Sequence, residues 1–301
     1  MSFAGDSVAS GPRPTLWRIV LAVAVLQTVA GACYPIAKYG LSIIEPFTFA
    51  FYRFLISSVV LLILAWTRRN DKPIEKQDWW RIVLLGILVI PINQTLFLVG
   101  QAMTGAGHGA FLFSTTPVWV FALAVIHLKE KATWRKGAGI VVAVSGVILI
   151  MWSGLAHFGK EYLVGDLIIV VSVVAWGYYT ILGQSLVRKY GALRTTAYAL
   201  ASGSAIYFPF GLYHAVKFDY SQTTPAAWGA VVYMALGLSV LAYVLWYWLI
   251  KHLEVSRVAV YHNIQPIWAS TVAYLFLNES LSPVFLVGGA LVLVGVLITE
   301  L

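Results

Sequence analysis

The chain is poor in cysteine and in charge. Its 301 residues include one cysteine, Cys33, and charged residues make up only 11% of the sequence. A single cysteine excludes an intramolecular disulfide and a cysteine-rich metal site, and we expect neither a metal ion nor a cofactor. Soluble domains contain about 25% charged residues, so this shortage of charge excludes an ordinary soluble domain.

Acidic residues are also missing from the long apolar runs. Each of the 12 Asp and Glu residues lies in a loop or within a few positions of the end of a run. Proton relays across a membrane usually use buried Asp, Glu or His side chains. The absence therefore disfavours proton coupling through a carboxylate and leaves His262 as the candidate for that role.

The sequence is instead strongly apolar, with a basic excess. Hydrophobic residues make up 60% of it, the mean hydropathy is +0.83 and the formal net charge is +8. The Lys and Arg residues stand in short bursts between apolar runs and form no patch with interleaved aromatic side chains. This pattern is typical of loops that fix orientation in a membrane, and it predicts no nucleic-acid partner.

Ten apolar runs are long enough to cross a bilayer, because a spanning helix needs about 20 mostly apolar residues. Continuous runs favour helices over strands, since a helix satisfies its own backbone hydrogen bonds in lipid. The sequence thus predicts an all-α polytopic membrane protein with a disordered cytoplasmic tail at residues 1-15. The ten transmembrane helices are expected at about residues 16-37, 46-66, 82-101, 106-128, 137-155, 164-187, 193-215, 226-250, 257-277 and 281-299.

Lys and Arg predict the orientation of these helices. With a cytoplasmic amino terminus, 16 of the 20 basic residues fall in cytoplasmic segments, three fall outside and Arg53 lies within a helix. Cytoplasmic loops carry the excess of Lys and Arg, so both termini are expected in the cytoplasm. The expected location is the inner (plasma) membrane of a bacterial cell.

The two halves of the chain repeat each other. Pro117-Val118-Trp119 and Glu130 recur 149 positions later as Pro266-Ile267-Trp268 and Glu279. Each copy has five helices, an odd number, so the second copy enters the membrane from the opposite side. Such inverted repeats are related by a pseudo-two-fold axis in the membrane plane and place a substrate path between them. We expect the repeats at 16-155 and 164-301, joined by an extracellular or periplasmic linker at 156-163.

Several motifs follow one another in an order that resembles the drug/metabolite transporter superfamily. These are Arg53 in the second helix, Trp176-Gly177 in the sixth, and a proline ahead of an acidic loop residue in each half. The chain is similar to the ten-helix EamA-type branch over nearly its whole length. Its aromatic-rich second half looks like the YddG-type aromatic amino-acid exporters. The resemblance implies a transporter built from two EamA-like repeats that works by alternating access.

Two basic residues bear on a transport path. Arg53 lies roughly 10 Å below the extracellular start of its helix, where an unpaired cation costs at least a few kcal/mol. It either reaches the outer interface, pairs with Glu45 or Asp166, or attracts a substrate carboxylate. Lys38, at the end of the first helix, is the other basic residue near a span, and two cations are too few for a phosphate-sugar cargo.

Prolines mark candidate hinges in the third, fourth and ninth helices. Pro91, Pro117 and Pro266 each remove a helix hydrogen bond and free carbonyls that can face a cavity. Side chains near them are predicted either to line a substrate cavity or to bond and pack between helices. These candidates are Asn93, Gln94, Phe113, Thr116, His262 and Gln265.

Aromatic side chains fall into two groups. Nine of the 12 Trp residues lie near helix ends, as a membrane-interface belt predicts. Tyr34, Trp176, Tyr179 and Tyr243 lie deeper and either pack between helices or stack on a planar substrate. Each aromatic pair contributes about 0.5 to 1.5 kcal/mol beyond the burial of area.

These features predict an exporter of small amphipathic metabolites, above all aromatic or neutral amino acids, that works as a facilitator through a central midplane cavity. The alternative is a proton-coupled exporter of multiple drugs or hydrophobic compounds, which an aromatic cavity suits equally. An intramembrane enzyme would need a nucleophile-base pair or metal ligands at depth, and the sequence suggests neither. The expected partners are the small-molecule cargo and the lipid bilayer, with the chain a monomer whose halves form a pseudo-dimer.

Overall fold

The computed structural model describes residues 14–67, 73–104, 106–150, 162–265 and 283–300. Helices make up nearly all of these residues, and no strand occurs among them. Six helical stretches in this part of the chain are long and apolar enough to cross a membrane. The all-α, multi-pass architecture predicted from the sequence is therefore confirmed.

Some of the predicted spans are single helices. Several extend past the predicted boundary, because a helix can continue after its apolar stretch ends. The sixth span runs on through Arg188 and Lys189 and stops at Gly191, whose φ of 84° suits glycine. These single helices are α1 (Leu16–Leu41), α2 (Pro46–Thr67), α7 (Trp134–Ile150), α9 (Leu163–Tyr190), α10 (Ala192–Lys217) and α15 (Pro283–Glu300).

Other predicted spans are interrupted helices. The third contains η1 (Lys76–Asp78), α3 (Trp79–Ile87), η2 (Leu88–Gln94) and α4 (Thr95–Met103). The fourth contains α5 (Ala106–Ser114) and α6 (Thr116–Leu128), and the eighth follows η4 (Tyr220–Gln222) as α11 (Pro225–Val232), η5 (Tyr233–Ala242) and α12 (Tyr243–His252). The ninth begins with α13 (Val255–Val260) and η6 (Tyr261–Ile264) and continues beyond the described residues.

The interruptions of the third and eighth spans fall at equivalent positions of the two repeats. Both η2 and η5 are π-helical, and the 149-residue offset places η5 over residues 84–93, which overlap η2. In each region a hydroxyl donates to the carbonyl five residues earlier, Thr95 to Ile90 at 2.9 Å and Ser239 to Met234 at 3.1 Å. π-Helical turns inside α-helices frequently mark functional sites.

Equivalent helices of the two repeats run in opposite directions. The start of α2 lies against the end of α10, where the Tyr207 hydroxyl donates to the Phe47 carbonyl at 3.1 Å and Glu45 contacts His214 at 2.8 Å. The start of α7 lies against the end of α15, because a side chain added at Gly139 would meet the Gly295 carbonyl. Since these are the second and fifth helices of each half, the repeats are inverted.

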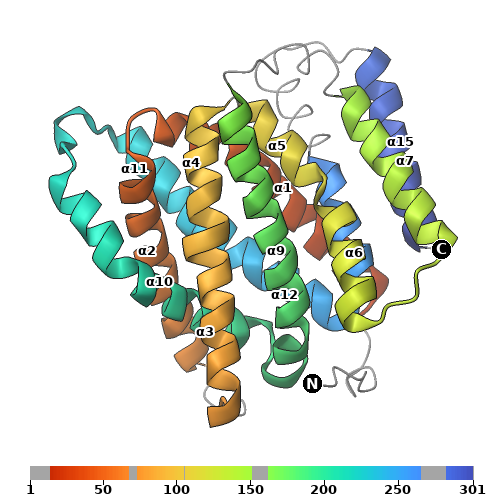
Figure 1. Ribbon diagram of the computed structural model, residues 1–301, viewed down its shortest axis with the longest axis horizontal. Helices are drawn as coiled ribbons and strands as arrows, with labels where there is room; N and C mark the ends of the chain where they lie inside the picture. Colours follow the sequence, from red (N-terminus) through yellow and green to blue (C-terminus); the bar gives the residue numbers. More distant parts are fainter. Residues whose placement is uncertain (1–13, 68–72, 105, 151–161, 266–282, 301) are drawn as a thin grey trace.

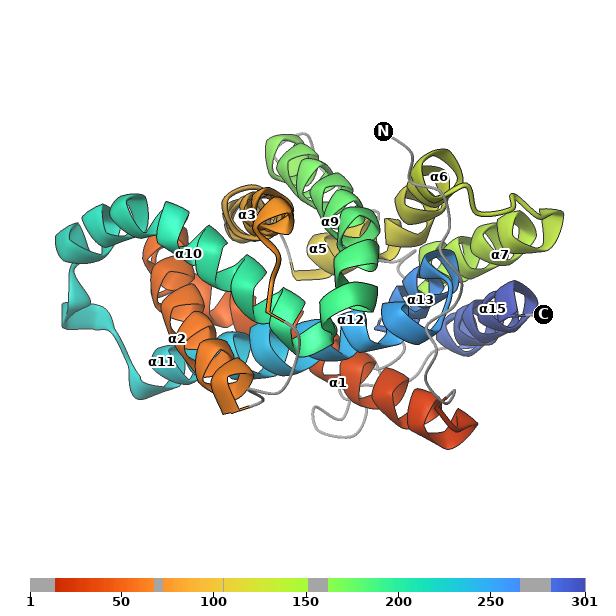
Figure 2. The same cartoon turned by 90° about the horizontal axis from the view of Figure 1, so that it is seen from below.

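The helices α7 and α15 form a pair at one edge of the molecule, beside the main bundle (Figures 1 and 2). A Cβ atom at Gly146 would lie 2.5 Å from the carbonyl oxygen of Gly288, and one at Gly295 would meet the backbone of Ala143. Small residues let two helices approach closely within lipid. Glycine is required at these positions because the two backbones nearly touch.

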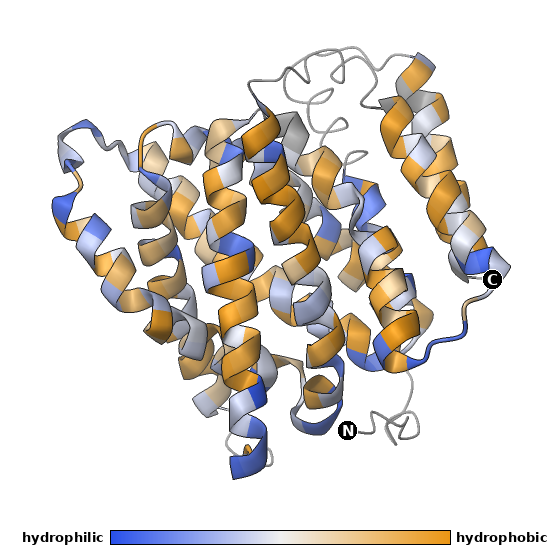
Figure 3. Ribbon diagram, in the orientation of Figure 1, coloured by the Kyte–Doolittle hydropathy of each residue, from blue (hydrophilic) through white to orange (hydrophobic). Residues whose placement is uncertain are grey.

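Large apolar side chains cover much of the outer surface, while polar residues gather toward the ends of the helices (Figure 3). The exposed side chains include Trp66, Ile126, Val216 and Leu297, each more than 60% exposed. Extensive apolar surface of this kind is rare on a soluble monomer. It is the surface that a bilayer would cover.

Candidate functional site

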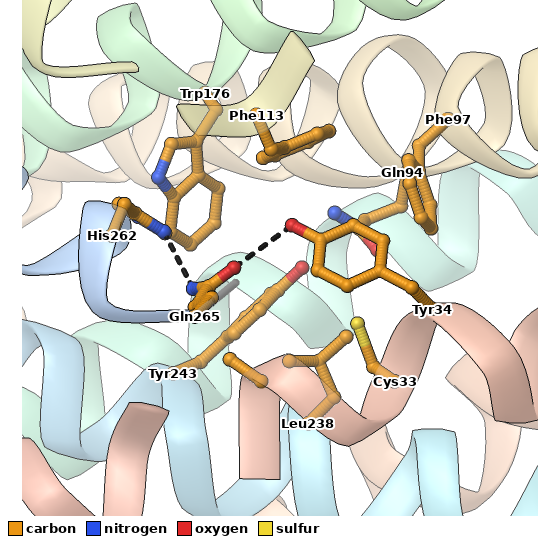
Figure 4. Close-up of a pocket in the computed structure, with 11 residues that line it drawn as sticks. Cys33, Tyr34, Gln94, Phe97, Phe113, Trp176, Leu238, Tyr243, His262 and Gln265 are labelled. Carbon is orange, nitrogen blue, oxygen red and sulfur yellow. Dashed lines mark hydrogen bonds between the residues drawn. The ribbon is translucent and has the colours of Figure 1, made fainter. Parts of the chain in front are cut away.

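A cavity of about 50 Å³ lies between the two repeats, with walls made by α1 and the third, fourth, sixth, eighth and ninth spans. Ten of its lining side chains are labelled in Figure 4. The first repeat supplies Ala30, Cys33, Tyr34, Gln94, Phe97 and Phe113, and the second supplies Trp176, Leu238, Tyr243, His262 and Gln265.

Equivalent positions of the two repeats line the same cavity. Gln94 and Tyr243 are separated by 149 residues, as are Phe113 and His262. Gln94 ends η2 and Tyr243 directly follows η5, so each stands next to a π-helical turn. The inverted repeat therefore sets the positions of the walls, while the residue types at those positions differ.

A chain of hydrogen bonds crosses the cavity wall from α1 to the ninth span. The Tyr34 hydroxyl donates to Gln265 Oε1 at 2.9 Å, and Gln265 Nε2 donates to Gln27 Oε1 at 3.0 Å. Gln265 Nε2 also lies 2.7 Å from His262 Nδ1. Because an amide nitrogen can only donate, His262 accepts at Nδ1 and is the tautomer with its proton on Nε2.

Aromatic rings form most of the remaining wall, as Figure 4 shows. The centroid of Trp176 lies 5.0 Å from that of Tyr243 and 6.4 Å from that of His262. On the opposite wall Phe97 and Phe113 lie 5.2 Å apart, and Tyr34 makes edge contacts with both. These faces suit a planar or apolar group of a ligand.

Several buried polar atoms of the wall make no hydrogen bond with any residue that the structure describes. They are Trp176 Nε1, Tyr243 Oη, His262 Nε2 and Gln94 Oε1. Buried polar groups in proteins are usually bonded, so each of these atoms is a candidate contact for a ligand. Most of them are donors.

The cavity is small for an organic ligand. At about 50 Å³ it has room for a few water molecules, whereas pockets for small organic ligands have at least ~300 Å³. A substrate would have to move the helices around it. The interrupted helices η2 and η5 lie in the wall where such a movement would be needed.

Of the ten residues predicted to bind substrate, seven line the cavity and three do not. Asn93 turns away and donates to the Ser172 carbonyl at 2.8 Å, so it joins two helices. Thr116 donates to the Phe113 carbonyl at 2.5 Å. Tyr179 stacks on Tyr247 at 4.8 Å and is fully buried behind the wall. The lining residues are Tyr34, Gln94, Phe113, Trp176, Tyr243, His262 and Gln265.

The candidate hinges have different local structures. Pro91 lies inside η2, where it accompanies the π-helical turn. Pro117 occupies the first turn of α6, where a proline is tolerated because its position needs no amide hydrogen. The fourth span is broken just before it, between α5 and α6. Pro266 lies outside the described residues.

The two candidate cations have different surroundings. Lys38 donates to the carbonyls of Gln101, Ala102 and Thr104, so it caps the end of α4 and stays away from the cavity. Arg53 is fully buried, and its Nε donates to Ser239 at 3.0 Å. Of the partners considered from the sequence, Glu45 instead contacts His214.

Four lining residues were not predicted from the sequence to bind substrate: Ala30, Cys33, Phe97 and Leu238. Phe97 follows Gln94 by three positions, which places both on one face of a helix, so this spacing was an available signal. Ala30 precedes the predicted residue Tyr34 by four positions in α1, and Cys33 is adjacent to it. Leu238 had no distinguishing signal, since it is one of many leucines in apolar runs.

Ionic clusters join the repeats at the end of the molecule where α3 begins. Lys189 lies 2.7 Å from both Asp78 and Glu75. The hydrogen bond from Lys189 holds the pKa of Glu75 below its usual range. This contact ties the start of the third span to the end of α9.

A second cluster at the same end joins the fourth and fifth spans to the ninth. Glu130 accepts from the Ser256 hydroxyl at 2.6 Å and from the Val255 amide at 3.1 Å, so it caps α13. Lys136 lies 2.8 Å from Glu254. Partial burial of Glu254 favours its neutral form, but the Lys136 and Arg257 cations together outweigh this and keep the pKa of Glu254 below its usual range.

Comparison with known proteins identifies the family. The model of the EamA-like transporter family matches residues 16–152 and again residues 163–301. The chain belongs to the EamA-like transporter family. It is a membrane transporter for a small-molecule substrate and not an enzyme, as the sequence predicted. Its family model matches each half separately, in agreement with the internal repeat.

Individual relatives agree with this family. An uncharacterized transporter of Archaeoglobus fulgidus is 30% identical over 93% of this chain and 96% of its own length. The uncharacterized transporter YyaM of Bacillus subtilis is 30% identical over 89% of this chain and 88% of its own. A probable terminal-alkyne amino-acid exporter of Streptantibioticus cattleyicolor is 29% identical, over 94% and 92%.

One solved structure shares the fold of this EamA-like transporter. It aligns with a TM-score of 0.72 over 93% of this chain and 95% of its own, at 17% sequence identity. The likeness concerns the fold alone. The narrower resemblance to YddG-type aromatic amino-acid exporters stays a prediction.

Proposed function

We propose that this transporter exports small amphipathic metabolites, in particular aromatic or neutral amino acids, through the cavity between its repeats. The observation that carries the proposal is the composition of the wall, where aromatic rings alternate with hydrogen-bonding groups and no carboxylate of the described residues takes part. Rings would receive an apolar side chain. The unpaired polar atoms would receive the charged groups of the cargo.

One relative supports this cargo class. It is named as a probable terminal-alkyne amino-acid exporter and aligns with nearly the whole of this chain. Export from a bacterial cytoplasm across the inner membrane also fits the predicted orientation, in which both termini are cytoplasmic. We further propose that one chain suffices, because its two inverted halves supply both walls of the cavity.

Alternating access would open the cavity to one side at a time. At the end predicted to be cytoplasmic, the Lys189 and Lys136 clusters would have to separate. At the other end, the contact of Glu45 with His214 and the 2.9 Å hydrogen bond between Tyr52 and Tyr220 would have to break. The π-helical turns η2 and η5 are the proposed hinges, since a wide turn bends more readily than a regular helix.

Facilitated transport suits the cavity better than proton coupling. His262 is the buried titratable histidine of the wall, and its Nδ1 already accepts from Gln265. A proton added at Nδ1 would leave two donors, the Gln265 amide and the His262 ring, pointing at each other without an acceptor between them. We therefore propose that the gradient of the cargo drives export.

The test is counterflow of labelled phenylalanine in proteoliposomes, with and without an imposed pH gradient. We expect saturable flux that unlabelled tryptophan or phenylalanine inhibits and that the pH gradient leaves unchanged. Flux that accelerates strongly in a proton gradient, with a response lost in His262→Ala, would establish the proton-coupled alternative. If the protein transports hydrophobic dyes and no amino acid, its cargo is a hydrophobic compound and the proposed cargo class is wrong.

A further inference from the structure

Arg53 is a buried cation in the middle of the bundle. It is fully buried in α2, among the largest side chains of the core. Its Nε donates to Ser239 Oγ at 3.0 Å, and its guanidinium carbon lies 4.9 Å from the Phe54 ring centroid. Ser239 belongs to η5, so Arg53 reaches from the first repeat to the π-helical turn of the second.

No carboxylate among the described residues pairs with Arg53. Both Nη1 and Nη2 lack a hydrogen-bond partner in the described part of the chain. Glu45 on the same helix accepts from Thr48 at 2.9 Å and contacts His214 instead. A buried charge without a partner is strongly unfavourable, and a charged residue within a span usually has a role in binding or moving a solute.

The surroundings of Arg53 connect it to the cavity. The Tyr243 hydroxyl and the Cys33 thiol both belong to the cavity wall, and both lie close enough to interact with the guanidinium. Tyr243 Oη makes no hydrogen bond of standard geometry with it or with any other described residue. Tyr243 therefore belongs both to the cavity wall and to the surroundings of the guanidinium.

The unpaired groups at the wall are mostly donors. Trp176 Nε1 and His262 Nε2 can only donate in this arrangement, Tyr243 Oη can do both, and Gln94 Oε1 is the acceptor. Together with the two free guanidinium nitrogens of Arg53, they require a ligand rich in acceptor oxygens. A carboxylate supplies several lone pairs and a negative charge, and it matches the fork of an arginine.

We propose that Arg53, assisted by the Tyr243 hydroxyl, binds the carboxylate of the cargo when the cavity opens. This inference rests on the proposed function and narrows its cargo to zwitterions and monocarboxylates. The aromatic wall would hold the side chain, and Gln94 Oε1 would accept from the ammonium group. Amines without a carboxylate would lose the principal contact, which sets this transporter apart from an exporter of cationic drugs.

The test compares phenylalanine with phenylalaninamide, which has the same ring and ammonium group without the carboxylate. In proteoliposomes the wild type is expected to move phenylalanine with at least about 30-fold higher efficiency, since breaking a buried charge pair has effects of this order. Arg53→Gln is expected to remove this preference by lowering phenylalanine flux alone. Arg53→Lys keeps the charge and should retain part of it.

A structural role for Arg53 predicts a different result. If Arg53 only fixed η5 through Ser239, Arg53→Gln would lower the flux of both compounds by the same factor, and that outcome would overturn the inference. Unchanged phenylalanine flux would overturn it as well. Tyr243→Phe keeps the ring and removes the hydroxyl, so a several-fold loss confined to phenylalanine is expected even if Arg53→Gln fails to fold.

A binding measurement distinguishes failure of this inference from failure of the proposed function. Quenching of tryptophan fluorescence by 3-phenylpropionate, a monocarboxylate, should be saturable in the wild type, be weakened several-fold in Tyr243→Phe and be lost in Arg53→Gln. If no amino acid is transported but this binding behaves as stated, the proposed function fails and the carboxylate site stands. If the wild type and both folded variants bind 3-phenylpropionate equally, the proposed carboxylate site is wrong.

Discussion

The two walls of the cavity come from duplicated sequence but carry different chemistry. The first repeat presents Phe97 and Phe113, and the second presents Trp176 and His262. Position 113 corresponds to position 262 by the 149-residue offset, so the first repeat has a phenyl ring where the second has an imidazole. The duplication accounts for the positions of the two walls, and substitutions at a few of these positions account for the difference in polarity between them.

The hydrogen-bond partners have diverged with them. Gln265 links His262 to Tyr34 and Gln27, whereas its repeat equivalent, Thr116, bonds locally to the Phe113 carbonyl. Gln265 therefore ties the second wall to the first, whereas Thr116 makes no such link across the cavity. Changes to the second wall should affect transport more than matched changes to the first.

Making the second wall like the first should have the largest effect. In His262→Phe the Gln265 amide loses an acceptor, and an unsatisfied buried donor corresponds to a loss of about 10- to 100-fold in efficiency. Phenylalanine counterflow is the measurement. The double variant His262→Phe/Phe113→His should not restore flux, because Thr116 cannot replace Gln265. Recovery in the double variant would mean that the two walls are interchangeable.

Removing the largest ring of the second wall should have a smaller and more selective effect. Trp176→Ala deletes ring contacts with Tyr243 and His262, and we expect a roughly 3- to 10-fold loss for aromatic cargo relative to aliphatic cargo. Competition of phenylalanine and leucine for flux measures this ratio. Trp119→Ala, at a position 39% exposed on the outer surface, is the matched control and should leave the ratio unchanged.

A substitution between α7 and α15, at the edge of the bundle, tests whether this pair of helices lies outside the transport path. Gly139→Val places a side chain against the Gly295 carbonyl and Thr299, and overpacking typically costs about 1 to 3 kcal/mol. The expected result is a lower thermal midpoint with an unchanged KM in the folded protein. Gly137→Val, where nothing lies within 4 Å, should shift the midpoint less. A raised KM in Gly139→Val would place this pair in the path.

The smallest effect concerns pH. In the folded protein the pKa values of Glu75 and Glu254 lie below 4.5, the usual value for a glutamate. A depressed carboxyl pKa contributes stability above the unfolded pKa, and this contribution is lost as pH falls through the folded pKa. The thermal midpoint should therefore be flat from pH 8 to about 5 and decline below about 4.5. In Glu254→Gln the decline should be shallower, and an equal decline would assign it to other groups.

The sequence predicted the architecture because its signals are long and repeated. Apolar runs, loop charges and the 149-residue offset each involve many residues, so single exceptions do not matter. The offset also identified residue 113 as the counterpart of His262, and both line the cavity. Trp176 could be selected because its depth separates it from the Trp residues of the interfacial belt.

Side-chain direction was harder to predict where the helix is irregular. Asn93 and Gln94 are adjacent, and the π-helical turn η2 decides that Gln94 faces the cavity while Asn93 bonds to Ser172. Tyr179 follows Trp176 by three positions in α9, yet it stacks on Tyr247 and does not line the cavity. Arg53 pairs with Ser239, 186 residues away, and no local pattern predicts a contact of that range.

Cys33 offers the most direct test of the cavity as the transport path, because it is the one cysteine of the chain and lies in the cavity wall. The measurement is the rate of alkylation of Cys33 by a small thiol reagent in proteoliposomes, with Cys33→Ser as the unlabelled control. We predict that cargo slows this alkylation with the same half-saturating concentration that it shows in transport. Full transport activity together with an alkylation rate that saturating cargo leaves unchanged would contradict the account.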